Sequence, residues 1–340
     1  MGSVAEILED VRVGGDVAVR EWALRLDGVE PARAEPAEGL PADAVLALAD
    51  AVRRWHEAQR PADVRLEIRP GVDLERRWLP LASVGIYVPR GLVSTLVMCA
   101  VPALAAGVAR IVVATPPEGS GLVAAAARLL GIDEVWALGG PPAIAAFAYG
   151  TETIPRVDKI CGPGGRYVNE AKLLVSREVA IDLPAGPSEV VVLAGRGAED
   201  EIAALELAAQ AEHGPDSTCR VVAVNGDAAA ALAEVDAIAP EHLVVLGEDA
   251  DVLADRVRNA GAVFVGPWSS VAAGDYATGG NHVLPTAGWA RSVGGLGLET
   301  FLKPVTVQRL TKEGLAALRP TVEALAAVEG MPAHAAAVRR

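Results

Sequence analysis

The chain has 340 residues, of which 51% are hydrophobic and 22% charged, and its formal net charge is −14. This balance is typical of a globular protein of about two domains, each large enough to bury a core. The acidic surplus disfavours binding to nucleic acid or to anionic lipid, because their phosphates would be repelled. No apolar run reaches the roughly 20 residues that a membrane span needs, so we expect no membrane anchoring.

The start of the chain lacks a basic segment followed by an apolar stretch, so we expect no secretory signal. Cys99, Cys161 and Cys219 are widely spaced and form no CxxC pair. They predict neither a disulfide framework nor a cysteine metal site, and each is expected to be a small buried hydrophobe. We therefore expect a cytoplasmic protein.

Apolar residues recur at spacings of three and four over residues 3–60, which predicts helices there. After residue 80, short apolar runs alternate with helical patterns. The first series predicts strands at 110–117, 134–140 and 159–165 and helices at 121–131, 142–150 and 166–176. The second predicts strands at 189–195, 219–226, 242–249 and 262–267 and helices at 198–214 and 250–261.

Strand–helix alternation with continuous apolar strands predicts an α/β fold, in which helices cover both faces of parallel sheets. Two such series predict two doubly wound domains that face each other. Ligands of such sheets bind beyond the carboxyl ends of the strands, so the informative loops should directly follow strands. The tail from about residue 298, with helices at 311–318 and 321–328, is expected to form a separate appendage.

The chain has only five histidines, at positions 56, 213, 242, 282 and 334. Taken singly, a histidine is more often structural than a ligand or a catalyst. Four of these five sit beside other polar residues, which increases the weight of a functional interpretation.

Gln210 and His213 lie three apart, at the end of a predicted helix that Gly214 closes. This spacing places both side chains on one helical face. An imidazole and an amide oxygen can bind a divalent metal, although glutamine is an unusual ligand. The alternative is a histidine favoured by the negative end of the helix dipole.

Glu241 and His242 are adjacent at the start of a predicted strand. A carboxylate beside an imidazole offers two groups suited to proton transfer. Neighbours in a strand point to opposite faces, so both can serve one site only where the backbone is irregular. The alternative is an exposed strand start.

A dense polar stretch, GDYATGGNHVLPT, covers residues 274–286 and contains Asp275, Tyr276, Asn281 and His282. Its glycines permit a loop that directs side chains inward. Asp275 could supply an oxygen ligand to a metal.

Glu329 and His334 lie five apart around a Gly-Met-Pro break, and each alone could be a solvated helix end. Taken with the other stretches, however, they complete a pattern that resembles histidinol dehydrogenase in a shortened form. The matching segments occur in that family's order: VGIYVP, FAYGTETIPRVDKICGPGGRYVNEAK, IDLPAGPSEV, AAQAEHGPDS, APEHL, AGDYATGGNHVLPT and EGMPAH.

The resemblance implies a pair of incomplete Rossmann-like domains, a helical N-terminal part and a small C-terminal appendage, in an intertwined homodimer. We place the first domain at 1–86 with 188–297, the second, dinucleotide-binding domain at 87–187, and a dimerisation tail at 298–340.

The resemblance also implies residue roles within active sites that the two subunits share. The ligands of one Zn²⁺ per subunit would be Gln210, His213, Asp275 and the partner subunit's His334. Glu241 and His242 would be the catalytic acid/base pair. Histidinol would be held by Ser94, Ser188, Tyr276, His282 and the partner subunit's Glu329.

On the cofactor side, the resemblance places Tyr87 beside NAD, but two positions depart from the family. Pro142 replaces a glutamine that contacts the dinucleotide, and Gly165 replaces an asparagine. Because both lost groups are hydrogen-bonding amides, we expect weakened NAD binding at these positions.

The implied activity is the zinc-dependent, NAD-linked oxidation of L-histidinol to L-histidine through L-histidinal, in histidine biosynthesis. His242 would take the alcohol proton, Glu241 would activate water, and zinc would hold the substrate's amino and imidazole nitrogens. One alternative is a dehydrogenase of the same scaffold that acts on another amino or sulfonated alcohol. Another is a zinc-dependent binding protein that has lost affinity for NAD.

Overall fold

The computed structural model describes residues 2–184, 186–212 and 214–339. The chain divides into two compact units, one formed by Met1–Gln59 with Leu81–Phe301 and the other by Arg60–Pro80 with Leu302–Arg340. These limits differ from the predicted boundaries at 86, 187 and 297. The first unit holds both parallel sheets together with the N-terminal helices, and the second joins a hairpin near residue 70 to the C-terminal tail.

The first unit contains a six-stranded sheet in the order β1-β6-β5-β4-β7-β8. Its strands are β1 (Ala32–Arg33), β4 (Ser83–Tyr87), β5 (Arg110–Thr115), β6 (Val135–Ala137), β7 (Lys159–Cys161) and β8 (Ala180–Ile181). All pairings are parallel except that of β1 with β6. The chain leaves β4 for β5 and later returns to its other side with β7. The point where the strand order reverses therefore lies between β4 and β7, which is where doubly wound sheets bind ligands.

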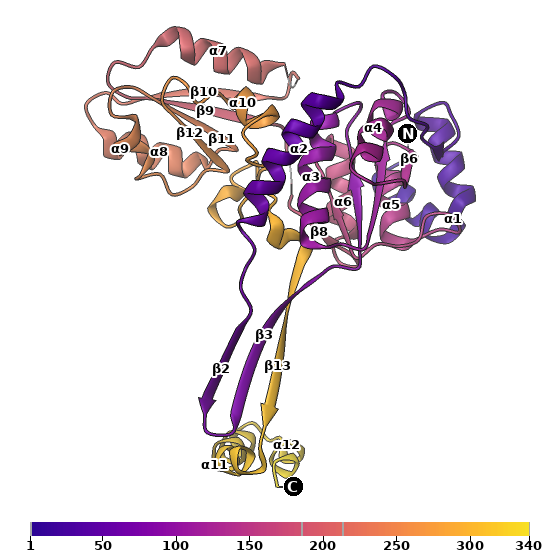
Figure 1. Cartoon of the computed structure of the whole chain (residues 1–340), viewed down its shortest axis with the longest axis vertical. Coiled ribbons are helices and arrows are strands. Elements are labelled where there is room, and N and C mark those ends of the chain that lie inside the picture. The colour runs from indigo at the N-terminus through magenta and orange to yellow at the C-terminus, as the bar shows by residue number, and fades with distance from the viewer. Residues whose placement is uncertain (1, 185, 213, 340) are drawn as a thin grey trace. The chain divides into compact units, whose positions relative to one another are not determined.

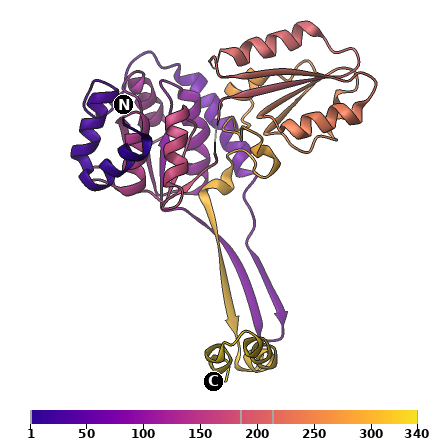
Figure 2. The ribbon, with the colours of Figure 1, turned by 180° about the vertical axis from the view of Figure 1, so that it is seen from behind.

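Helices cover both faces of this sheet, as Figures 1 and 2 show. They are α1 (Val4–Leu26), α2 (Ala42–Glu57), α3 (Val93–Ala106), α4 (Ser120–Leu129), α5 (Gly140–Tyr149) and α6 (Arg166–Val175). One face carries α5 and α6, with α1 packed outside them, over a core that includes Tyr87, Val112 and Ala114. The other face carries α3 and α4, with α2 packed against them.

A four-stranded parallel sheet in the order β10-β9-β11-β12 completes the first unit. Its strands are β9 (Glu189–Ala194), β10 (Thr218–Ala223), β11 (His242–Leu246) and β12 (Ala262–Val265). Its helices are α7 (Asp200–Ala211), α8 (Ala228–Ile238), α9 (Ala250–Ala254) and α10 (Val271–Tyr276), followed by the short helices η1 (Trp289–Arg291) and η2 (Leu298–Phe301). Residues of α8 and α9 pack on one face, and residues of α7 and α10 pack on the other. The predicted α/β class with parallel sheets is thus confirmed.

The second unit is built on an antiparallel sheet in the order β13-β3-β2. It comprises β2 (Val64–Arg69), β3 (Val72–Pro80), β13 (Leu302–Leu310), α11 (Lys312–Val328) and α12 (Pro332–Ala337). The sequence pattern does not predict these strands, because charged residues interrupt their apolar residues and every residue of β2 is exposed. The two predicted tail helices are a single helix, α11, which contains Pro320.

No helix among residues 2–184, 186–212 and 214–339 combines the length and the apolar character needed to cross a bilayer.

Candidate active site

A pocket of about 1150 Å³ lies where the two parallel sheets of the first unit meet. Pro89, Gly164 and Gly165 follow β4 and β7 and line it from the carboxyl ends of the first sheet, as predicted. The second sheet contributes differently: Ser188, Glu241 and His242 lie at the amino ends of β9 and β11. The expectation that informative loops follow strands is therefore wrong for this sheet. In the sequence, only residues 182–188 separate β9 from β8, the edge strand of the first sheet.

Glu241 and His242 are both buried, and the main chain of Glu189 holds them side by side. The Glu189 N–H donates to Glu241 Oε2 over 2.8 Å, and the Glu189 carbonyl oxygen lies 3.2 Å from His242 Nδ1. Because a carbonyl oxygen only accepts, Nδ1 carries the proton of a neutral His242, and the basic lone pair belongs to Nε2. His242 Nδ1 is also 3.6 Å from Glu241 Oε2. The two side chains thus serve one site despite being neighbours in sequence.

The environment of Glu241 favours its protonated form. Burial, together with the negative charges of Glu189 and Asp275, raises the pKa of Glu241 to about 8, although hydrogen bonds from the Glu189 N–H and the Ser188 side chain oppose this shift. A carboxyl group with such a pKa exchanges protons near neutral pH, as a general acid or base must.

Asp275 and His282 form the opposite wall of the pocket. Asp275 is buried in α10, and its Oδ1 lies 3.9 Å from His242 Nε2 and 3.8 Å from His282 Nδ1. His282 Nδ1 is 3.2 Å from the Asp275 carbonyl oxygen, and His282 Nε2 is 3.4 Å from Thr95 Oγ1. A buried carboxylate therefore stands between two imidazoles.

The helix that carries Gln210 is fastened to the helix that carries Asp275. Glu206, one turn before Gln210 in α7, accepts the N–H of Val271 over 3.1 Å, and Val271 lies one turn before Asp275 in α10. Gln210 is only 2% exposed, and neither its Oε1 nor its Nε2 has a hydrogen-bond partner within residues 2–184, 186–212 and 214–339. Buried amides are rarely left unpaired, so a missing partner such as a metal ion fits this position.

The predicted ligand set is not complete in the structure. Within the described part of the chain, no three His, Cys, Asp or Glu side chains are grouped closely enough to hold a metal ion. His213 lies outside the described residues, and His334 is an exposed residue of the second unit. Among the described residues of the first unit, Gln210 and Asp275 are the predicted metal ligands.

On the cofactor side, the turn after β7 lies directly against β4. A Cβ atom at Gly162 would approach the Tyr87 carbonyl oxygen to 2.1 Å, and the φ of Gly162 is +106°, so only glycine fits. The Gly162 N–H donates to Asp182 over 2.7 Å, and the buried Lys172 binds both the Gly162 carbonyl oxygen, at 2.8 Å, and Asp182 Oδ1, at 2.5 Å. This ion pair fixes the turn that leads to Gly165.

Tyr87 and Pro142 are not among the described residues that line the pocket. Tyr87 is buried, and its hydroxyl oxygen accepts the N–H of Gly140 over 3.1 Å at the start of α5. Pro142 is buried in the first turn of the same helix. Gly165 lines the pocket as the N-cap of α6 and offers no side-chain cap.

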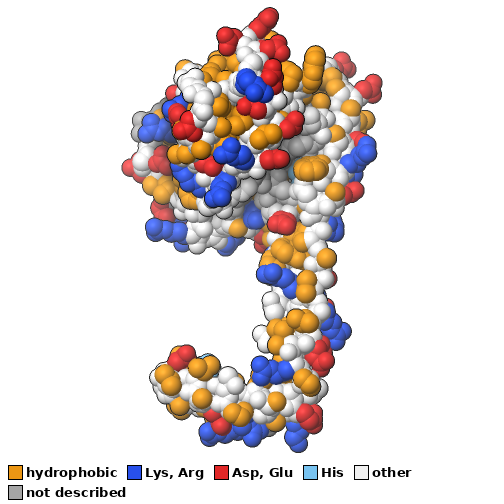
Figure 3. Space-filling view, turned by 90° about the vertical axis from the view of Figure 1, so that its left-hand side faces the viewer, with side chains coloured by type: hydrophobic (Ala, Val, Ile, Leu, Met, Phe, Trp, Pro, Cys, Tyr) orange, Lys and Arg blue, Asp and Glu red, His pale blue; other side chains and the backbone are white. Residues whose placement is uncertain are grey.

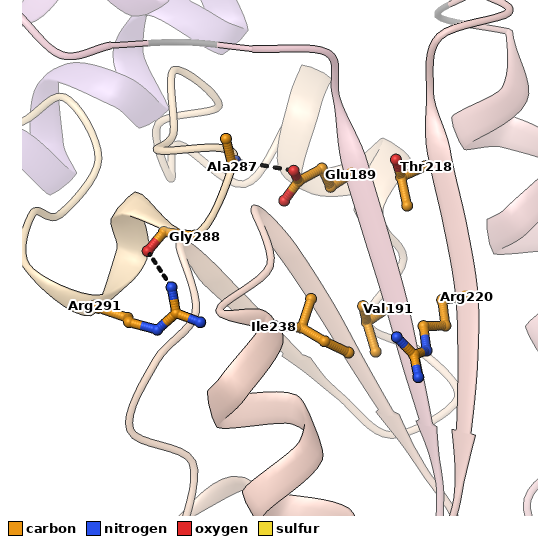
Figure 4. A pocket seen from close by; sticks show the side chains of 8 residues that line it. All are labelled: Glu189, Val191, Thr218, Arg220, Ile238, Ala287, Gly288 and Arg291. Carbon is orange, nitrogen blue, oxygen red and sulfur yellow. Dashed lines mark hydrogen bonds between the residues drawn. The ribbon is translucent and has the colours of Figure 1, made fainter.

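A smaller cavity of about 320 Å³ lies on the four-stranded sheet (Figure 4). Its two arginines are already engaged, because Arg220 pairs with Glu234 and Arg291 donates to the carbonyl oxygens of Gly288 and Ala237. The carboxylate of Glu189 accepts the N–H of Ala287 over 2.9 Å (Figure 4). The residues around this cavity therefore support Glu189, through Ala287, and they do not form a second reaction site.

Comparison with known proteins supports the resemblance seen in the sequence. The family model for histidinol dehydrogenase matches residues 1–234 and 222–340. The chain is 42% identical to histidinol dehydrogenase of Halobacterium salinarum, over 98% of this chain and 91% of the relative. It is 39% identical to the same enzyme of Escherichia coli K12, over 99% of this chain and 90% of the relative. The chain belongs to the histidinol dehydrogenase family.

A solved structure also matches the fold. The crystal structure of histidinol dehydrogenase from Elizabethkingia anophelis superposes with a TM-score of 0.91 at 33% identity, and covers 98% of this chain and 90% of that one.

The pocket collects most of the residues that the resemblance to histidinol dehydrogenase predicted. Those that line it are Ser94, Gly165, Ser188, Glu241, His242, Asp275, Tyr276 and His282. Glu329 and His334 are exposed residues of the second unit. Their roles, like those of the residues in the pocket, stay predictions.

Three residues that contribute to the site were not predicted from the sequence. Thr95 contacts His282, Glu189 holds the acid/base pair with its main chain, and Glu206 links the two helices that carry ligand candidates. Thr95 and Glu189 each directly follow a predicted substrate residue, and this adjacency was the available signal. Nothing in the sequence marks Glu206 as buried.

The raised pKa of Glu241 predicts a pH dependence of stability in metal-free protein. Unfolded Glu241 ionises near pH 4.5, whereas the folded group keeps its proton to about pH 8. The free energy of unfolding therefore falls as pH rises through this window, by at most about 1.4 kcal/mol per pH unit. The free energy of unfolding of Glu241→Gln, measured by urea titration with chelator present, should fall less steeply than that of the parent. The exposed Glu57→Gln should behave like the parent, and equal slopes for the parent and Glu241→Gln would refute the assignment.

Proposed function

We propose that this chain oxidises L-histidinol to L-histidine through L-histidinal, with NAD as the acceptor, as a step of histidine biosynthesis. Membership of the histidinol dehydrogenase family supports the proposal. The observation that carries it is the placement of Glu241 and His242 opposite Asp275 and His282 in one pocket. In that arrangement, two groups suited to proton transfer lie 3.6 Å apart. Asp275 lies 3.9 Å from one of them, His242, and 3.8 Å from His282, and this carboxylate and imidazole could bind the substrate imidazole.

His242 is suited to take the proton of the substrate alcohol. The Glu189 carbonyl oxygen holds the Nδ1 proton, so the lone pair of Nε2 faces the side of the pocket where Asp275 lies. Ser94, Ser188 and Tyr276 line the same space and can hold the polar groups of the substrate. His282 faces it beside Asp275 and would contact the substrate imidazole.

Glu241 is suited to activate water for attack on the aldehyde. Its carboxylate share grows as pH approaches its pKa of about 8, so this role is favoured on the alkaline side of neutrality. The Glu189 N–H fixes the carboxylate beside His242, which keeps the two proton-transfer groups in register.

The first sheet is suited to bind the dinucleotide. NAD, when bound, would supply the hydride acceptor for both oxidation steps. Gly164, Gly165 and Arg166 line the pocket at the start of α6, whose first N–H groups have no side-chain cap. A helix N-terminus of this kind attracts a pyrophosphate. Pro142 lies in the first turn of α5, where Tyr87 binds Gly140. Its replacement of a glutamine would cost one amide contact to the dinucleotide, but the strand ends that form the site are still present.

Substitution of the pair should separate the two half-reactions. Glu241→Gln should slow oxidation of histidinal more than that of histidinol, because only the aldehyde step needs activated water. His242→Ala should slow the alcohol step more, and loss of either general acid or base should cost about 100- to 10,000-fold. The measurement is NADH absorbance with each substrate in turn.

Equal small losses in both steps would show that the roles are misassigned. A parent that oxidises another amino alcohol but not histidinol would support the same-scaffold alternative. A parent that binds histidinol and metal but produces no NADH at millimolar NAD would support the binding-protein alternative.

A zinc ion is the group that the donor set fits best. Gln210 presents a buried amide that has no hydrogen-bond partner among the described residues, and Asp275 presents a buried carboxylate one turn beyond the point where its helix is bonded to α7. We infer that these two residues hold the metal together with His213 and the partner subunit's His334, at one ion per subunit. Zinc, when bound, would act as a Lewis acid that holds the substrate's amino and imidazole nitrogens.

Gln210→Ala should weaken zinc binding by more than about tenfold, measured by competition with a chelator. The exposed Gln308→Ala of the second unit is the matched control and should leave the affinity unchanged. An unaltered affinity in Gln210→Ala, or a parent without stoichiometric metal after purification without chelator, would remove Gln210 from the ligand set.

A homodimer with shared sites would use the second unit. This unit exposes large apolar side chains on β2 and α11, namely Val64, Leu66, Leu325 and Val328. Exposed apolar surface of this kind is typical of sites where proteins associate. Figure 3 shows apolar side chains mixed with charged ones over this part of the chain. We infer that a second copy of the chain covers this surface and that the partner subunit receives Glu329 and His334 at its site.

Mixed subunits test this sharing. Inactive His334→Ala and inactive His242→Ala chains, once exchanged, should form heterodimers with one intact site and recover part of the parent activity. If subunit exchange is demonstrated by mass spectrometry and no activity returns, the tail acts within its own subunit.

A further inference from the structure

His56, a histidine that the proposed reaction does not use, is completely buried in α2. Its Nδ1 lies 2.7 Å from the Val52 carbonyl oxygen one turn earlier, so Nδ1 carries the proton. Burial lowers the pKa of His56, although the carbonyl groups of Val52 and Leu296 oppose this shift. The ring is therefore neutral near pH 7, and its Nε2 can accept a hydrogen bond.

Asn281 supplies that hydrogen bond and joins three parts of the fold. Its Nδ2 lies 3.3 Å from His56 Nε2 and 2.7 Å from the Met98 carbonyl oxygen in α3. Its Oδ1 accepts the N–H of Val283 over 2.9 Å. Both amide hydrogens and the amide oxygen are thus used, and the side chain links α2, α3 and its own loop.

The loop before Asn281 also lies directly against α2. Gly279 has a φ of +92°, and a Cβ atom there would approach the Ala51 carbonyl oxygen to 2.5 Å. Only glycine allows this approach. Two independent contacts, one of backbone and one of side chain, therefore seat the loop on the same helix.

The residue that follows, His282, belongs to the pocket. His282 Nε2 lies 3.4 Å from Thr95 Oγ1, and Thr95 precedes Met98 by one turn of α3. The loop thus contacts α3 at two successive turns, with Asn281 on the carbonyl of Met98 and His282 on the hydroxyl of Thr95. Displacement of Asn281 would shift His282 relative to Asp275.

We propose that His56 and Asn281 are positioning residues for recognition of the substrate imidazole, because together they seat the loop that presents His282. The inference rests on the proposed function, in which His282 contacts that imidazole. It extends the site to α2, whose residues do not touch the pocket within the described part of the chain.

The test compares four variants. Asn281→Asp keeps the shape but loses both amide donors, and His56→Phe keeps the bulk of the ring but loses the acceptor. His56→Gln places an acceptor near the position of Nε2 and should retain the hydrogen bond from Asn281. Asn259→Asp is the matched control, because Asn259 donates to the Asp236 carbonyl oxygen over 2.9 Å elsewhere in the first unit.

For Asn281→Asp and His56→Phe, we expect the KM for histidinol to rise at least about tenfold, with the KM for NAD unchanged and kcat reduced less than KM is raised. Amide hydrogen exchange should accelerate in residues 277–283 of these two variants. His56→Gln and Asn259→Asp should stay close to the parent in both measurements.

A lower melting temperature with unchanged KM and unchanged exchange in the loop would overturn the proposal and leave a purely structural role. If the parent itself does not oxidise histidinol, the proposed function fails. In that case the exchange of residues 277–283 still decides whether His56 and Asn281 seat the loop.

Discussion

Two hydrogen bonds to the main chain of one residue, Glu189, determine the geometry of the candidate site. Its N–H binds Glu241 and its carbonyl oxygen lies against His242. The first residue of β9 therefore positions both proton-transfer groups. Strand β9 pairs with β11, which His242 begins, and the register of these two parallel strands therefore sets the spacing of the pair. The Glu189 side chain is in turn held by the N–H of Ala287. A backbone anchor of this kind leaves the two functional side chains little freedom, which is what preorganised acid–base chemistry requires.

The two parallel sheets contribute opposite ends to the pocket, and this division separates two kinds of chemistry. The first sheet presents glycine-rich turns after β4 and β7, together with the uncapped start of α6, which suit a phosphate-bearing cofactor. The second sheet presents carboxyl and imidazole groups at the starts of its strands. The buried pair of Lys172 and Asp182 ties the turn after β7 to the segment that leads to Ser188. Removal of either charge would leave the other buried and unpaired, which is strongly destabilising. The ion pair therefore keeps the two segments together.

Several groups in the site are arranged for chemistry at some expense to folding. Gln210 buries an amide without a partner in the described part of the chain, and Glu241 buries a carboxyl group whose ionised form is disfavoured. An unpaired buried amide costs about 1–3 kcal/mol. Well-packed helices and strands on both sheet faces offset such terms, and α2 adds the seat for the loop that bears His282.

The α/β class and most strand positions could be predicted from the sequence, because continuous apolar runs between amphipathic segments occur wherever both faces of a sheet are buried. Glu241, His242, Asp275 and His282 could also be named, because their local motifs match those of a known family. Strands β2, β3 and β13 could not, because they pair with one another in an exposed sheet and carry no buried run. Nor could the sequence show that Glu189 anchors the pair or that His56 meets Asn281, 225 residues away. Such contacts between distant segments exist only once tertiary packing brings buried polar groups together and obliges each of them to find a partner.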